Sequence, residues 1–204
     1  MTDAFIERTR EFFAVRAATW DTKFGHDVPV YAAAIAEAGI RGGGVAVDVG
    51  CGTGRALPAL RAAVGPDGTV IGLELTPQML AQARAKGWAE SGDLLVLADA
   101  RRLPFAAASV DALFAAGLVN HLPDPAAGFA EFARVTRPGG LLILFHPVGR
   151  ATLAARHGRA ISPEETLSSG PLRRETAATG WRLLTYDDGP DRFLAVAVRR
   201  LALR

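Results

Sequence analysis

The chain has 204 residues, of which 50% are hydrophobic and 22% are charged, and its formal net charge is +2. This length and apolar content predict one globular domain with a sizeable core. The arginines are spread along most of the chain, which argues against the basic stripe or tail of a strong nucleic-acid binder.

Composition also indicates where the protein acts. Cys51 is the only cysteine, so an intrachain disulfide is excluded and nothing indicates secretion. The stretch 1–13 carries charges where a signal peptide would need an unbroken apolar core, and no apolar run approaches the roughly 18 residues of a membrane span. A cytoplasmic protein without membrane contact is therefore expected. The sequence does not indicate its oligomeric state.

Residues 1–40 are expected to be helical. The apolar residues of the stretch 4–18 fall near one helix face. Asp27 can cap a second helix, which has Pro29 in its first turn and is followed by Gly39.

From residue 44 the pattern changes to strands that alternate with helices. The run 44–50 is rich in β-branched residues and nearly all apolar, as expected of a strand covered on both faces. Similar runs predict further strands over 68–75, 93–100, 109–116 and 140–147. Helices are expected between them, over 54–64, from Pro77 to near Gly87 behind the cap Thr76, and from Pro125, behind the cap Asp124, to just before 137.

The C-terminal quarter predicts one more helix and a hairpin. Ser162, Pro163 and Glu165 form a capping box that would start the helix. The stretches 180–188 and 191–203 look like two strands joined by a turn, and so like an antiparallel hairpin. The whole pattern predicts an α/β fold, with a doubly wound, Rossmann-like, mostly parallel sheet and an antiparallel C-terminal hairpin.

The turn after the first strand, in the sequence "VDVGCGTG" (47–54), is the natural ligand site of such a sheet. Gly50 and Gly52 let a ligand approach the backbone, and Gly54 opens the helix whose amides can meet an anion. A triphosphate loop is excluded because it needs a lysine here, and the only lysines are Lys23 and Lys86. A dinucleotide motif would need a third glycine where Arg55 stands. A tight turn without any ligand remains the alternative.

Two acids follow the next strands. Glu74 ends the second strand and can accept hydrogen bonds from two ribose hydroxyls, as in dinucleotide folds. Asp99 ends the third strand and can accept from an adenine amino group. The alternative for Glu74 is a solvated carboxylate at a strand end.

Together with the stretches 110–124 and 137–145, these motifs resemble, over residues 41–146, the class I S-adenosylmethionine-dependent methyltransferases. The resemblance is greatest to the small-molecule branch around the ubiquinone/menaquinone-biosynthesis methyltransferases. It implies a seven-stranded sheet whose last strand is antiparallel, and S-adenosylmethionine as cofactor. It also implies that residues 1–204 form a single methyltransferase domain, with a helical lid over 1–40 and a cofactor-binding core over 41–204.

The resemblance also implies roles for single residues. Asp48 would hold the amino group of the cofactor, and the turn at Gly50, Cys51, Gly52 and Gly54 would follow its methionine part. The ribose would bind Glu74. The residues implied to border the adenine or the amino-acid end are Leu75, Asp99, Ala100, Ala116 and Gly117. Asn120 and His121 fall where relatives often carry two histidines, so the first of that pair is absent.

Methyl transfer from a sulfonium needs alignment of the nucleophile, exclusion of water and sometimes removal of a proton. His121 and His146 lie near the ends of predicted strands, where each can act as a base or only line the rim of the cleft. The four histidines show no metal-binding spacing, so no metal is expected.

Two further segments have alternative interpretations. Trp20 and Phe24, four residues apart, would share one helix face and either contact the substrate and sulfonium or pack on the sheet. Arg150, Arg156 and Arg159 make the stretch 146–162 basic, which suits an anionic substrate or partner, although solvated surface arginines are the simpler interpretation.

The leading hypothesis is an enzyme that methylates a small molecule at oxygen, nitrogen or carbon. A methyltransferase of RNA or protein is the second hypothesis, although the Asn/Asp-Pro-Pro-Tyr/Phe motif of many N-methylating enzymes is replaced by "AAGL" at 115–118. The third is a binding protein or cyclase that keeps the cofactor pocket without transferring a methyl group.

Overall fold

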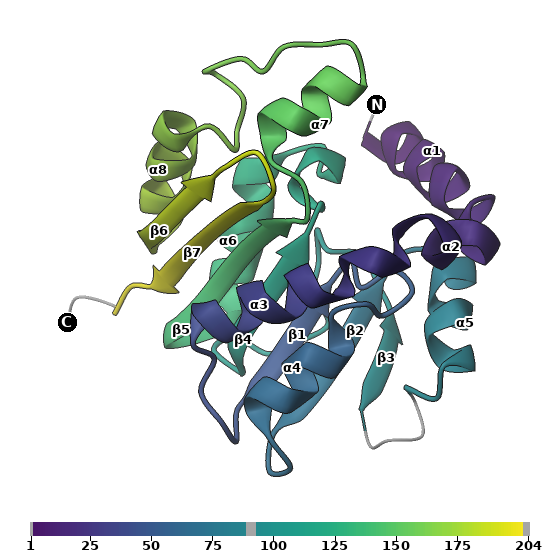
Figure 1. Ribbon diagram of the computed structural model, residues 1–204. Coiled ribbons are helices and arrows are strands. Elements are labelled where there is room, and N and C mark those ends of the chain that lie inside the picture. The colour runs from purple at the N-terminus through teal and green to yellow at the C-terminus, as the bar shows by residue number, and fades with distance from the viewer. Residues whose placement is uncertain (1, 89–92, 202–204) are drawn as a thin grey trace.

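Seven strands form one central sheet in the computed structural model, which describes residues 2–88 and 93–201 (Figure 1). Their order across the sheet is β3-β2-β1-β4-β5-β7-β6. The pairs from β3 to β5 are parallel, and β7 is antiparallel to both of its neighbours. The bounds of the strands are Val45–Val49 (β1), Thr69–Glu74 (β2), Leu94–Leu97 (β3), Val110–Ala116 (β4), Thr136–His146 (β5), Trp181–Asp188 (β6) and Phe193–Arg199 (β7). The predicted fold class is confirmed.

Helices lie on both faces of this sheet and over one of its edges (Figure 1). The α-helices of the described residues are Thr2–Ala14 (α1), Trp20–Phe24 (α2), Val28–Ala38 (α3), Leu57–Val64 (α4), Pro77–Ala85 (α5), Pro125–Val135 (α6), Arg150–Arg156 (α7) and Ser169–Ala178 (α8). Single turns of 3₁₀-helix occur at Ala17–Thr19 (η1), Gly25–Asp27 (η2) and Val119–His121 (η3). None of the helices in the described part of the chain is long and apolar enough to cross a membrane.

The two faces of the sheet have separate apolar cores because successive strand residues point to opposite sides. On one face, helices α3 and α4 pack over the fully buried ring of Phe114. On the other, α6 and α8 pack with Trp181, whose indole Nε1 donates to the Phe129 carbonyl at 3.0 Å. Burial on both faces explains why the central strands are nearly continuous apolar runs.

The strand order reverses between β1 and β4. From β1 the chain proceeds to β2 and β3 on one side and then returns to β4 and β5 on the other. In a doubly wound sheet, the loops at such a reversal diverge and leave a crevice at the carboxyl ends of the strands. The glycine turn after β1 lies at this position.

Two local predictions were wrong near the C-terminal half. Strand β5 begins at Thr136, because Thr136 pairs with Val110 of β4 beyond a register shift. Residues 137–139, which were expected to separate the helix from the strand, therefore belong to the strand. The capping box at Ser162 starts no helix. Its Glu165 carboxylate does accept from the Ser162 amide at 3.2 Å, but it also binds Arg159 at 2.8 Å, and the helix begins only at α8.

The bounds of the other predicted helices and strands agree with expectation within a few residues, with two differences. Helix α7, over the basic stretch, was not predicted. The last predicted strand ends at Arg199, and residues 202 and 203 of its predicted range lie outside the described residues. Asp124 caps α6 by accepting from the Ala127 amide at 3.1 Å, as predicted.

Candidate functional site

A cavity of about 820 Å³ opens at the carboxyl ends of β1, β2, β4 and β5. Its floor is the glycine turn and the strand ends, and residues of α1, α2 and α7 form its walls. Every predicted site residue except Gly54 lines it. The topology therefore collects side chains from six separate segments at the reversal of strand order.

The glycine turn is fixed to the end of β2 by three hydrogen bonds. The amides of Gly50 and Cys51 donate to the Leu73 carbonyl at 2.8 and 2.9 Å, and the Gly52 amide donates to Glu74 Oε2 at 2.9 Å. The backbone φ values of Gly50, Gly52 and Gly54 are +77°, +55° and +83°, a conformation that residues other than glycine rarely adopt. Backbone geometry is therefore the first reason for these glycines.

Gly52 and Gly54 differ in what surrounds them. A Cβ added at Gly52 would meet no protein atom within 4 Å, so this position faces the open cavity. A Cβ at Gly54 would lie 3.0 Å from Leu57 Cδ1 and 3.1 Å from Trp88 Cδ1. Gly54 thus allows close packing at the start of α4 and does not line the cavity.

The Glu74 carboxylate is buried and holds the floor of the cavity together. Besides the Gly52 amide, it accepts from the Thr76 amide through Oε1 at 2.7 Å. An ionised carboxylate has about four acceptor positions on its two oxygens. Two positions are therefore left for donors from a ligand such as a ribose diol.

Asp48 lies at the end of β1, only 2% exposed, and its carboxyl makes no hydrogen bond within the described residues. Burial raises the pKa of Asp48 to about 8, the charge of Glu74 adds to this rise, and Arg55 opposes it. At neutral pH the free protein therefore keeps this carboxyl mostly protonated. A cation placed beside it would favour the carboxylate instead.

Asp99 and Ala100 border the cavity beyond β3. The Asp99 carboxylate accepts from the Arg101 amide at 2.9 Å and from Arg101 Nε at 2.8 Å. Arg101 therefore orients the carboxylate, and a ligand amino group would share it with this side chain.

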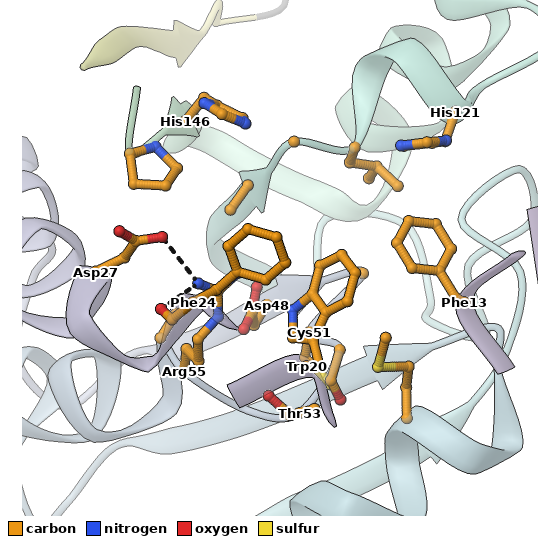
Figure 2. A pocket seen from close by; sticks show the side chains of 18 of the residues that line it. Phe13, Trp20, Phe24, Asp27, Asp48, Cys51, Thr53, Arg55, His121 and His146 are labelled. Atoms are coloured by element: carbon orange, nitrogen blue, oxygen red, sulfur yellow. Dashed lines mark hydrogen bonds and ion pairs between the residues drawn. The ribbon is translucent and has the colours of Figure 1, made fainter. Parts of the chain in front are cut away.

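Aromatic side chains form a row along one wall of the cavity (Figure 2). The ring of Trp20 lies 4.7 Å from Phe24 and 5.5 Å from Phe13, and Phe13 lies 5.1 Å from His121. Phe13 was not predicted as a site residue, although it belongs to the segment 1–40 that was expected to form a helical lid. Together, Phe24, Trp20, Phe13 and His121 form what we call the aromatic row.

The two predicted histidines differ in how they are held. His146 Nδ1 lies 2.8 Å from the Val148 carbonyl oxygen and 3.1 Å from the Val148 amide, so the ring is anchored to the loop after β5. The shorter contact favours Nδ1–H as donor, which leaves Nε2 able to accept a proton. His121 contacts the ring of Phe13 instead. Burial lowers the pKa of both His121 and His146, so both are neutral at pH 7.

The N-terminal segment is bound to the glycine turn through side chains that sequence reasoning did not assign to the site. Thr53 Oγ1 donates to Asp21 at 2.6 Å, and Lys86 pairs with Asp21 at 2.5 Å. Arg55 donates to the Phe24 carbonyl at 3.0 Å and to Asp27 at 3.3 Å (Figure 2). Asp27 therefore does not cap α3 as expected, because its carboxylate faces Arg55.

Among residues 2–88 and 93–201, no group of three or more histidines, cysteines or acids is arranged to hold a metal ion. The free thiol of Cys51 is buried, and burial raises its pKa well above the ordinary value. The site therefore offers hydrogen-bond acceptors, aromatic faces and two neutral imidazoles.

Comparison with known proteins agrees with this chemistry. Residues 47–144 match the methyltransferase domain family. A demethylmenaquinone methyltransferase of Staphylococcus aureus is 37% identical over 105 residues, which cover 52% of this chain and 44% of the relative. The matched part of the chain thus spans less than half the length of that relative.

Solved structures are similar over most of the chain. The methyltransferase in a complex with the Trm112 activator of Haloferax volcanii has a TM-score of 0.77 at 21% identity, covering 96% of this chain and 99% of that one. A SAM-dependent methyltransferase of Aquifex aeolicus has a TM-score of 0.74 at 22% identity, over 91% of this chain and 98% of that one. The [4+2]-cyclase SpnF has a TM-score of 0.63 at 21% identity, over 84% of this chain and 81% of that one. At these identities the likeness concerns the fold.

Together, these comparisons confirm the resemblance to class I S-adenosylmethionine-dependent methyltransferases and, with it, the cofactor of this type of domain. Which residues of this chain contact the cofactor stays a prediction, and two variants test it.

The first test concerns space at the turn. Gly52→Val should abolish S-adenosylhomocysteine binding, since its side chain would enter the cavity. Gly43→Val is the matched control, because Gly43 also has a positive φ (+74°) and an open Cβ direction but does not line the cavity. Both variants should lose about 1–2 kcal/mol of unfolding free energy, because a residue with a Cβ is strained in the left-handed backbone conformation. Equal affinities of the two variants, measured by calorimetry, would refute the assignment.

The second test concerns Asp48. If the amino group of the cofactor lies beside it, binding of S-adenosylhomocysteine at pH 7 should release most of one proton, because a carboxyl with a pKa of about 8 becomes ionised. Calorimetry in buffers of different ionisation enthalpy counts this proton, and the release should disappear in Asp48→Asn but persist in Asp99→Asn.

Stability gives an independent readout of the same pKa. The free folded protein keeps a proton that the unfolded chain loses above about pH 4, so this group lowers stability progressively as pH rises from about 4 to 8. The unfolding free energy of Asp48→Asn minus that of the wild type should therefore be larger at pH 8 than at pH 5. An unchanged difference between the two pH values would contradict the raised pKa.

Proposed function

Since residues 47–144 match the methyltransferase domain family, we propose that this chain transfers a methyl group from S-adenosylmethionine to a small-molecule acceptor, at oxygen, nitrogen or carbon. The observation that carries the proposal is the single cavity in which the strand-end acids and the aromatic row meet. Its volume of about 820 Å³ suits small ligands.

The cofactor would lie along the floor of this cavity. Its amino group would approach Asp48, its methionine part would follow Gly50 to Gly52, and its ribose hydroxyls would donate to the free acceptor positions of Glu74. The adenine would lie between Leu75 and the Asp99–Ala100 stretch.

The acceptor would occupy the side of the cavity bordered by the aromatic row and the two histidines. Aromatic faces attract a sulfonium cation and exclude water from it. An acceptor held between this wall and the sulfonium would attack the methyl carbon in line. Alignment of this kind can supply a large part of the rate enhancement by itself.

Where the acceptor must lose a proton, His146 is the better placed base. Its Nδ1 is anchored on Val148, so the ring cannot turn away, and Nε2 remains able to take the proton. His121 lacks such an anchor within the described residues and packs edge-on against Phe13.

We also propose that residues 1–40 act as the lid of a single methyltransferase domain. Ile6, Thr9 and Phe13 of α1 line the cavity, and so does the aromatic pair of α2. The contacts of Asp21 and Phe24 with the glycine turn are polar and accessible, so they can open and close without loss of the core.

Two other functions compete with this one. One is a methyltransferase that acts on RNA or protein, and the other is a cyclase or binding protein, since the [4+2]-cyclase SpnF shares this fold. The wall formed by α1 and α2 favours a small acceptor, because it covers the cavity against a macromolecule.

A two-stage experiment separates the three functions. Calorimetry should show binding of S-adenosylmethionine and S-adenosylhomocysteine but not of NAD. The protein is then incubated with methyl-labelled S-adenosylmethionine and a cell extract separated into small molecules, RNA and protein. Label in the small-molecule fraction supports the proposal, and label in RNA or protein overturns the proposed acceptor. Binding without any transferred label would favour a cyclase or binding protein.

With the acceptor found in this way, His146→Ala should lower turnover by about 10²–10⁴-fold, the usual contribution of a positioned base, with cofactor affinity nearly unchanged. Because the pKa of His146 lies below its ordinary value of 6.5, wild-type turnover should fall only as pH drops below about 6.5 and stay level above it. A similar loss in His121→Ala alone would identify His121 as the base. Full activity in both variants would leave alignment as the whole mechanism.

A further inference from the structure

The three arginines of the basic stretch 146–162 have different environments. Arg150 is buried and pairs with Glu165 and Asp188, each at 3.0 Å. Arg159 pairs with Glu165 at 2.8 Å and does not line the cavity. Carboxylates of the chain itself therefore balance two of the three charges.

Arg156 is the exception. It ends α7, its side chain is exposed and lines the cavity, and within the described residues it forms no ion pair or hydrogen bond. Helix α7 follows the short loop after β5, which ends at His146, so Arg156 lies on the histidine side of the cavity. In Figure 1, α7 lies across from α1 and α2, whose residues form the opposite wall.

The other charges around the opening do not neutralise Arg156. Asp27 is engaged by Arg55 at 3.3 Å and by His26 at 3.2 Å. Asp191 lines the cavity next to Pro190, whose carbonyl accepts from Thr152 near the start of α7, whereas Arg156 is at the opposite end of that helix. Lys23 of α2 also lines the cavity and has no acidic partner within the described residues.

We infer that the methyl acceptor carries a carboxylate, which Arg156 binds at the α7 side of the cavity while the body of the acceptor packs on the aromatic row. This inference rests on the proposed function. A guanidinium can hold both carboxylate oxygens at once, so it fixes direction as well as position. A planar acid held in this way would present its opposite edge toward the cofactor.

The same contact affects the chemistry. The C–S bond to the methyl group breaks as the acceptor oxygen or nitrogen forms its bond to that carbon, the electron pair stays on sulfur, and the proton of the acceptor goes to His146 Nε2. Burial is the main cause of the lowered pKa of His146 and the charge of Arg156 adds a smaller part, which a carboxylate bound to Arg156 would offset. Binding of the correct acceptor would therefore also prepare the base.

The test uses the full chain saturated with S-adenosylhomocysteine and a panel of hydroxybenzoates, each paired with its uncharged hydroxybenzamide. Ligand-observed NMR and calorimetry measure the affinity for each pair. At least one acid should bind about 10- to 100-fold more tightly than its amide, as expected for a charge-assisted contact. Arg156→Gln should remove this preference, and Arg159→Gln, which removes the same charge from the same segment outside the cavity, should keep it.

The remaining outcomes are equally decisive. Equal binding of acids and amides, absence of binding by every acid, or a preference that survives in Arg156→Gln overturns the inference. Weaker S-adenosylhomocysteine binding by Arg156→Gln also overturns it, because the arginine would then serve the carboxylate of the cofactor. If the wild type does not bind S-adenosylhomocysteine at all, it is the proposed function that fails, and this titration precedes the others.

Discussion

The contact between the Glu74 carboxylate and the backbone of the glycine turn determines how the site is built. It joins the carboxyl ends of β1 and β2 through the amides of Gly52 and Thr76. Buried in this way, the carboxylate keeps the turn in its left-handed geometry and fixes its own acceptor positions toward the cavity. Burial is the main cause of the raised pKa of Asp48, and the charge of Glu74 adds to it.

The walls of the cavity depend on the same turn. Thr53 and Arg55, which follow the glycines directly, hold α2 and the loop before α3. A ligand that shifts the turn by even a small distance therefore shifts the aromatic row with it. The proposed cofactor and acceptor sites would thus be coupled through Thr53 and Arg55, as well as through their common boundary.

Sequence patterns were sufficient for the sheet and for most of the floor of the site. Apolar runs covered on both faces identified the strands, and parallel strands bring their terminal acids to one edge. Strand β5 was underestimated because Pro138 and Gly139 are typical of turns, and its extra pairing with β4 depends on a partner distant in sequence. The contacts of Asp21 and Arg55 could not be predicted, because they depend on where the N-terminal segment packs. The sequence indicated an anionic ligand only for three arginines together, and the ion pairs of Arg150 and Arg159 are what set Arg156 apart.

The sheet order has a consequence for the way the chain is made. β7 is the last strand in the sequence, yet it lies between β5 and β6 and supplies all the sheet hydrogen bonds of β6. During translation, the backbone N–H and C=O groups along this edge of β5 therefore have no strand partner until residues 193–199 have left the ribosome. Unpaired strand edges promote aggregation, so the sheet is open to wrong pairing at this edge until β7 is in place.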